Sequence, residues 1–143
     1  MSSRIAWLKV GVIFDTCEFI FAERSKKRVQ DILLHLPVTE SAYVSVITLA
    51  ELKHGVRRAD TPQRAFKRQQ FLDEVMLAFI ILPVTAEIAL KAGELDAELE
   101  LQGAALDIAD IIIAATALEH NLSVLTRNTR HFERIRGLRM LTP

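Results

Sequence analysis

The chain has 143 residues, of which 50% are hydrophobic and 25% are charged, with 18 basic and 18 acidic side chains. This composition indicates one folded domain over residues 1–143, excludes a globally disordered chain, and excludes nucleic-acid binding by bulk charge alone. A single cysteine excludes a disulfide framework and a cysteine-based zinc site. The apolar runs are too short to span a membrane and no signal peptide is evident, so we expect a cytoplasmic protein.

Short apolar runs alternate with helical patterns along the chain. Strands are predicted at 10–14, 42–45, 79–84, 122–126 and 138–141. Helices are predicted at 16–35, 48–56, 62–78, 85–102, 107–120 and 128–134. This alternation predicts an α/β fold whose central, mainly parallel sheet of about five strands is flanked by helices. Residues 1–9 precede the first strand as a candidate N-terminal extension.

Three single residues refine this prediction. Phe66 is predicted to face inward from the helix at 62–78, together with Phe71, Leu72 and Val75. Pro83 favours an edge position for the strand at 79–84. Gly103 is expected to end the helix at 85–102.

Three acidic residues lie where strands give way to helices. Asp15 follows the first strand, Glu51 lies early in the helix after the second strand, and Asp110 opens the helix before the fourth strand. Parallel α/β sheets bind ligands beyond the carboxyl ends of their strands. Clustered carboxylates repel one another unless a cation lies among them, and Mg²⁺ or Mn²⁺ prefers oxygen ligands.

Helix capping is the competing interpretation for all three acids. The segments that fit a cap or capping box are Asp15–Glu18, Thr48–Glu51 and Asp107–Asp110. Capping is least convincing for Asp110, because this residue directly precedes the apolar run 111–118, which must be buried. A charge beside a buried run is costly unless it is paired or bound to a metal.

Four segments together resemble the signature segments of PIN-domain nucleases, and more closely the VapC-type toxins of toxin–antitoxin pairs. They are Phe14–Cys17, Ser45–Gly55, Asp107–Leu118 and Leu125–Phe132, in the order and spacing of that family. The resemblance implies a Mg²⁺- or Mn²⁺-dependent endoribonuclease with an RNA substrate. It also implies a homodimer and inhibition by a small cognate antitoxin whose tail occupies the active-site groove.

The resemblance also assigns roles to individual residues. Asp15, Glu51 and Asp110 would be the catalytic, metal-binding acids, with Thr16 as a polar neighbour. Family members often carry a fourth acid in the segment where this chain has Asn128 and His131. Asn128 would then orient water or cap the next helix, and His131 is the one histidine in a candidate site segment. Asp107 is a candidate substitute for the missing acid, because residues i and i+3 share a helix face.

Basic residues and a helix pair complete the expected interaction surfaces. Arg127 and Arg130 flank the site and are the best candidates for contacts with the RNA backbone. The region 53–80 carries an amphipathic helix pair that, by the resemblance, receives the antitoxin. Cys17 is expected to be a small buried side chain without chemistry.

Two other functions compete with the nuclease. A PIN-fold module that only binds RNA or antitoxin would explain the missing fourth acid. A phosphoacceptor receiver or an aspartate-nucleophile phosphatase would also use an acidic pocket. A phosphatase of that kind would carry a second aspartate two positions after the first, where this chain has Cys17.

Overall fold

A computed structural model describes residues 11–37 and 39–143. The five strands are β1 (Gly11–Phe14), β2 (Ser41–Ser45), β3 (Ile80–Leu82), β4 (Ser123–Leu125) and β5 (Met140–Leu141). The helices are α2 (Thr16–Arg24), α3 (Val29–Leu33), α4 (Val46–Arg57), α5 (Pro62–Ala78), α6 (Ala86–Leu101), α7 (Ile108–His120) and α8 (Thr129–Phe132). The candidate extension at 1–9 lies outside the described residues.

The five strands form one sheet in the order β3-β2-β1-β4-β5, and every neighbouring pair is parallel. The predicted α/β fold with a parallel sheet of about five strands is therefore confirmed. β3 lies at an edge, as Pro83 predicted. Gly103 follows the end of α6 with a φ of 69°, a left-handed conformation that glycine adopts without strain.

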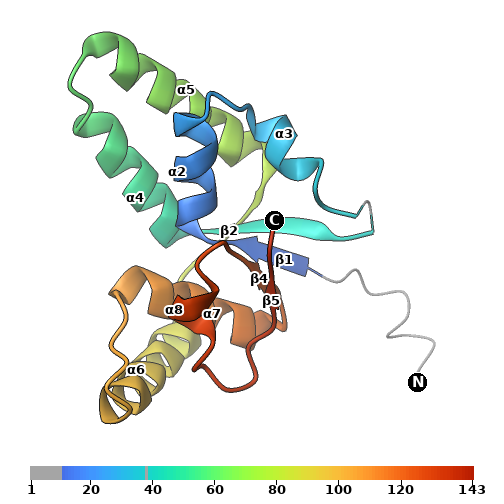
Figure 1. Cartoon of the computed structure of the whole chain (residues 1–143), viewed down its shortest axis with the longest axis vertical. Coiled ribbons are helices and arrows are strands. Elements are labelled where there is room, and N and C mark those ends of the chain that lie inside the picture. The colour runs from blue at the N-terminus through green and yellow to red at the C-terminus, as the bar shows by residue number, and fades with distance from the viewer. Residues whose placement is uncertain (1–10, 38) are drawn as a thin grey trace.

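Helices cover both faces of the sheet (Figure 1). α2, α3, α4 and α5 lie on one side, and α6, α7 and α8 lie on the other. Side chains of β1 point alternately into the two cores, since Val12 and Phe14 pack with α2, α3 and α5 while Ile13 packs with α6 and α7. No helix in the described part of the chain is long and apolar enough to cross a membrane.

Two predictions, one about a helix and one about a buried side chain, differ from the structure. The helix expected over 16–35 is two helices, because Lys26 adopts a φ of 57° that a right-handed helix cannot accommodate. Phe66 is 69% exposed rather than buried. It lies near the start of α5, where α4 and α5 project together beyond the sheet (Figure 1), whereas Phe71 and Val75 further along α5 are buried.

Candidate active site

Asp15 lies at the carboxyl end of the central strand β1 and is almost completely buried, with 2% of its surface exposed. Its backbone N–H donates to the Leu125 carbonyl at 3.0 Å, which joins the ends of β1 and β4. Its Oδ2 atom accepts hydrogen bonds from the Thr126 hydroxyl at 2.8 Å and the Cys17 thiol at 3.0 Å. Asp15 occupies the N-cap position of α2, but its side chain makes no capping hydrogen bond. Capping therefore does not explain this carboxylate.

Glu51 is held by a chain of two threonine hydroxyls. Thr16 donates to Glu51 Oε1 at 2.7 Å, and the Thr16 and Thr48 hydroxyls lie 2.8 Å apart. Since Thr16 has a single hydroxyl hydrogen, Thr48 must be the donor in its contact with Thr16. The capping box predicted at Thr48–Glu51 is wrong, because α4 begins at Val46 and Ser45 is its N-cap.

Asp110 lies in the first turn of α7, facing other carboxylates. The pKa of Asp110 is raised from 3.8 to about 6, first by burial and then by the negative charges of Asp15, Asp107 and Glu51, while His131 opposes the rise. The Asp110 Oδ2 and His131 Nδ1 atoms are 3.2 Å apart. The three predicted acids are therefore close enough for two of them to disfavour ionisation of the third.

Asp107 and Asn128 occupy helix N-cap positions without capping. Neither side chain makes a capping hydrogen bond to α7 or α8, respectively. The cap interpretation of the Asp107–Asp110 pattern and of Asn128 is therefore not supported by hydrogen bonds. Asp107 contributes to the site electrostatically, because its charge raises the pKa of Asp110.

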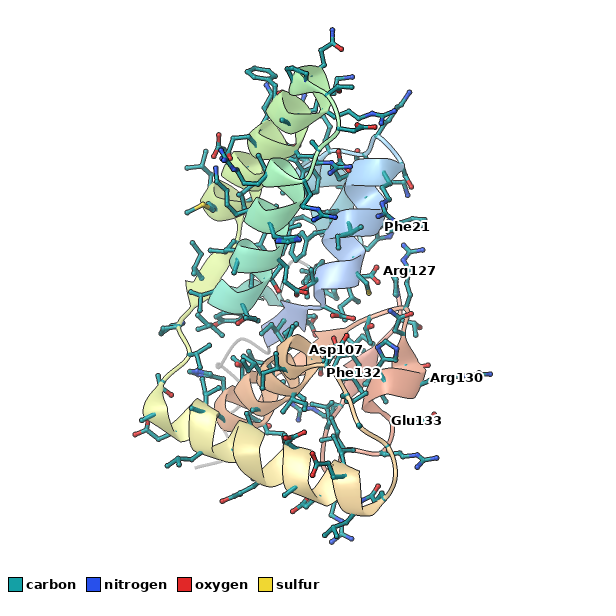
Figure 2. The ribbon with its side chains drawn as sticks, turned by 90° about the vertical axis from the view of Figure 1, so that its left-hand side faces the viewer. Phe21, Asp107, Arg127, Arg130, Phe132 and Glu133 are labelled. Carbon is teal, nitrogen blue, oxygen red and sulfur yellow. The ribbon has the colours of Figure 1, made fainter. Side chains whose placement is uncertain are left out.

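Glu18, which was not among the predicted site residues, joins α2 to the loop between β4 and α8. Glu18 is 4% exposed, and its two carboxylate oxygens accept from the Arg127 backbone N–H at 3.0 Å and from Arg127 Nε at 2.9 Å. The Arg127 guanidinium also stacks on the Phe21 ring at 3.7 Å (Figure 2). The signal in the sequence was an acid three residues after Asp15, on the side of α2 that faces the sheet.

Thr126 and Cys17 were also missed as partners of Asp15. Burial and the neighbouring Asp15 raise the pKa of the Cys17 thiol far above its ordinary value. The thiol therefore keeps its proton and acts as a hydrogen-bond donor, not as a nucleophile. Thr126 is fully buried and also accepts from the Asn128 backbone N–H at 2.9 Å, so it fixes the start of the loop before α8.

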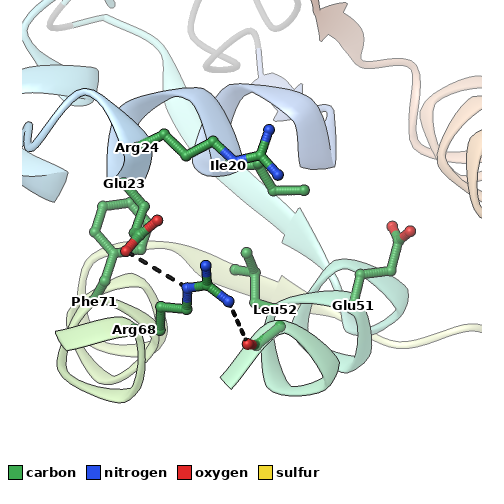
Figure 3. Close-up of a pocket in the computed structure, with 8 residues that line it drawn as sticks. Ile20, Glu23, Arg24, Glu51, Leu52, Arg68 and Phe71 are labelled. Carbon is green, nitrogen blue, oxygen red and sulfur yellow. Dashed lines mark hydrogen bonds and ion pairs between the residues drawn. The ribbon is translucent and has the colours of Figure 1, made fainter. Parts of the chain in front are cut away.

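The two arginines proposed for RNA contacts differ in their surroundings. Arg127 is bound to Glu18 and Phe21, whereas Arg130 points outward from α8 (Figure 2). A pocket beside the acids lies between α2, α4 and α5 (Figure 3). It is lined by Ile20, Glu23, Arg24, Glu51, Leu52, Gly55, Arg68 and Phe71.

The donor set of the site suits a hard divalent cation. Asp15 Oδ1, Glu51 Oε2 and Asp110 Oδ1 accept no side-chain hydrogen bond from the described residues, and like charges disfavour ionised Asp110. Among those residues, no three His, Cys, Asp or Glu side chains converge closely enough to enclose an ion. Mg²⁺ commonly binds through one or two carboxylates and keeps several waters, so this open arrangement fits it.

Comparisons with known proteins agree with the fold. The PIN domain family model matches residues 12–138. Ribonuclease VapC1 of Rickettsia felis is 35% identical over 133 residues, covering 93% of this chain and 96% of that protein. The tRNA(fMet)-specific endonuclease VapC of Shigella flexneri is 33% identical over 96 residues, covering 67% of this chain and 70% of that protein.

A solved structure extends the likeness to three dimensions. The complex VapBC2 of Rickettsia felis, bound to a DNA fragment from its promoter, superposes with a TM-score of 0.81 at 26% identity. The match covers 93% of this chain and 98% of that chain. The chain belongs to the PIN-domain family and, within it, to the VapC group.

Proposed function

We propose that this protein is an endoribonuclease that hydrolyses RNA phosphodiester bonds with the help of Mg²⁺ or Mn²⁺, as the toxin of a toxin–antitoxin pair. The observation that carries the proposal is that Asp15 and Glu51 lie close enough to Asp110, at the carboxyl edge of the sheet, for their negative charges to raise its pKa. The names of the VapC relatives support ribonuclease activity. The titles of the VapBC structures support a toxin–antitoxin pair.

Asp15, Glu51 and Asp110 would hold the metal ion. When bound, a divalent ion activates water and stabilises negative charge on a phosphodiester. The chain's own contribution is to fix the ligand atoms: Thr126 and Cys17 occupy Asp15 Oδ2, and Thr16 occupies Glu51 Oε1. One oxygen of each carboxylate is then left for the metal, which lowers the entropy lost on binding.

The substrate side of the site is polar and basic at its margin. Asn128 makes no helix-cap bond, so we assign its amide to substrate or water. Arg130 extends from α8, and we assign it to the RNA backbone. Arg127 would contact RNA only through the face of its guanidinium turned away from Phe21, because Glu18 holds its Nε. Thr16 and Asp107 act as neighbours of the metal ligands.

We further assign the pocket between α2, α4 and α5 to the antitoxin. Glu51 lines it, so a peptide seated there would reach the acids. Arg68 bridges the pocket wall, donating to the Gly55 carbonyl at 2.8 Å and lying 3.9 Å from Glu23 (Figure 3). We expect the toxin to act in the cytoplasm as a homodimer.

A catalytically weakened PIN module is the second candidate. It is favoured by Asn128 and His131, which stand in the segment where family members often carry a fourth acid. Such a module would bind RNA or antitoxin through the same surfaces. It would not cleave RNA with any divalent ion.

RNA cleavage distinguishes the two candidates. Purified, antitoxin-free protein is incubated with a pool of tRNA and structured RNA in Mg²⁺, Mn²⁺ or EDTA, beside Asp15→Asn and Asp110→Asn. Asp73→Asn, on the exposed side of α5, is the matched control. We expect cleavage in metal that is lost in EDTA and in both site variants and kept in the control. Cleavage that survives in EDTA or in both site variants would contradict the proposal, and a folded wild type without cleavage would favour the binding module.

A further inference from the structure

Arg127 and Phe21 form a flat, partly exposed stack beside the acids. The Arg127 guanidinium lies over the Phe21 ring at 3.7 Å (Figure 2), and 44% of the arginine side chain and 41% of the phenylalanine are exposed. Arg127 directly follows Thr126, whose hydroxyl donates to Asp15 Oδ2 at 2.8 Å. The stack therefore lies at the carboxyl end of β4, next to the site proposed for cleavage.

One buried carboxylate fixes Arg127 in this position. Glu18 is 4% exposed and accepts from the Arg127 backbone N–H at 3.0 Å and from Arg127 Nε at 2.9 Å. The Cys17 thiol connects this pair to the acids, since it lies 3.4 Å from Glu18 Oε2 and 3.0 Å from Asp15 Oδ2. Because Glu18 holds the Nε edge and Phe21 covers one face, the opposite face of the guanidinium is left for a ligand. Its orientation is set before the ligand arrives, which lowers the entropy lost on binding.

The surroundings of Arg127 favour a nucleobase over a phosphate as its ligand. A planar guanidinium can stack on an aromatic ring, and unstacked RNA bases stack on guanidinium planes. The Glu18 carboxylate already offsets the charge of Arg127, so this arginine adds little net attraction for a phosphate. Arg130 differs, because it points outward from α8 and makes no ion pair with the described residues.

We propose that Arg127, supported by Phe21, binds RNA by stacking a nucleobase on the outer face of its guanidinium. This inference rests on the proposed function and deepens it: the ligand of Arg127 is a base, whereas Arg130 contacts the backbone. Every base has a π-face, so the stack holds a nucleotide beside the acids without selecting one base strictly. Arg127 is thus a residue that positions the substrate.

Binding of short RNAs to the antitoxin-free full chain tests this in EDTA, which prevents metal-dependent cleavage. The probes are fluorescein-labelled oligoadenylate of about ten nucleotides and an abasic RNA of the same length. Both carry the same phosphates, but only the first carries bases. Fluorescence anisotropy at several salt concentrations gives each affinity and its salt dependence.

Two variants alter the stack, and each has a matched control. Arg127→Lys keeps the positive charge and loses the plane, while Phe21→Leu removes the supporting ring and leaves the Glu18 contact in place. Arg139→Lys is the first control, because Arg139 donates to the carbonyl of a residue that precedes β4, at the opposite end of that strand. Phe66→Leu is the second, because Phe66 is exposed near the start of α5. Thermal unfolding confirms that each variant is folded.

We expect wild type and both controls to bind oligoadenylate about fivefold or more tightly than the abasic RNA. Arg127→Lys should lose about fivefold in affinity for oligoadenylate, with unchanged affinity for the abasic RNA and unchanged salt dependence, and Phe21→Leu should lose less. Equal losses on both RNAs or a weaker salt dependence in Arg127→Lys would indicate a phosphate contact and overturn the inference. Unchanged binding in Arg127→Lys would also overturn it, because Arg127 would then only hold Glu18.

The same preparation separates this inference from the proposed function. Metal-dependent cleavage by a wild type whose binding does not depend on Arg127 would leave the nuclease standing without the stack. The expected binding losses in a protein that cleaves RNA with no divalent ion would support the stack and contradict the nuclease. A wild type that binds neither RNA would contradict both.

Discussion

The two sides of the site are built by different means. On one side, Asp15 is buried and accepts hydrogen bonds from a hydroxyl and a thiol. On the other side, Asp110 is partly exposed, contacts His131 and faces carboxylates that raise its pKa. The first side is positioned before any ligand arrives, and the second carries repulsion that a cation would relieve. A metal site can therefore combine a rigid ligand with one whose charge is costly until the metal binds.

The largest effect is expected on RNA cleavage, which should be lost whether Asp15 or Asp110 is substituted. Loss of a partner of a metal ligand already costs roughly 10- to 100-fold in affinity or activity. Removing the charge of Asp15 or Asp110 should therefore lower the cleavage rate more than roughly 100-fold. Initial rates on RNA at saturating metal measure this. A loss confined to one of the two variants would contradict the proposal that both acids bind the metal.

The free energy of unfolding should depend strongly on Arg127, which binds Glu18 on the same side of the site as Asp15. Arg127→Ala leaves the buried Glu18 carboxylate without its guanidinium, and breaking fully buried pairs costs about 3–5 kcal/mol. Because 44% of the Arg127 side chain is exposed, we expect a smaller loss of about 2 kcal/mol. Urea unfolding measures it, with Arg130→Ala expected within about 0.5 kcal/mol of wild type. Equal losses would contradict the role of Glu18.

Thr126→Val should weaken the positioning of Asp15. The change removes the hydrogen bond to Asp15 and the one accepted from the Asn128 backbone N–H, so we expect a loss of about 1–2 kcal/mol in stability and roughly tenfold in cleavage. Thr116→Val is the matched control, because Thr116 is also buried and its hydroxyl donates to the Ile112 carbonyl within α7. It should lose similar stability and keep its activity. Equal losses of activity would mean that Thr126 acts only through stability.

Cys17 should give the smallest effect. A thiol is a weak donor and Thr126 still holds Asp15 in Cys17→Ala, so we expect a reduction in cleavage of only about twofold to threefold. The raised pKa of the thiol predicts slower alkylation by iodoacetamide at pH 8 than for free cysteine. Alkylation as fast as that of free cysteine would contradict the assigned hydrogen bond to Asp15.

The fold and the three acids were predicted from the sequence. Strand and helix periodicities are local properties, so they predicted an α/β sheet. The positions of Asp15, Glu51 and Asp110 within that pattern placed the acids at one edge of the sheet. The break at Lys26 was missed because no glycine or proline marks it. The prediction that Phe66 is buried was wrong, because periodicity does not show where a helix extends beyond the core.

The partners of the acids required the fold. Thr126 lies 111 positions from Asp15, and Arg127 lies 109 positions from Glu18. Local capping patterns were misleading at Thr48, because Ser45 begins the helix one turn earlier. Spacing along the chain identifies candidate acids, but the hydrogen bonds that orient them come from segments that meet only in the folded sheet.

The most direct test of the account measures unfolding and cleavage on the same preparation of Asp110→Asn. The pKa of Asp110 is raised to about 6 in the folded chain, so the folded state binds the proton more tightly than the unfolded state. Stability from this group is complete below about pH 4 and is lost as the pH rises through about 6. In EDTA at pH 7.5, Asp110→Asn should therefore be more stable than wild type by about 1 kcal/mol, with the gap closing toward pH 4, and should not cleave RNA. A variant that is less stable than wild type at pH 7.5, or that still cleaves, would contradict the account.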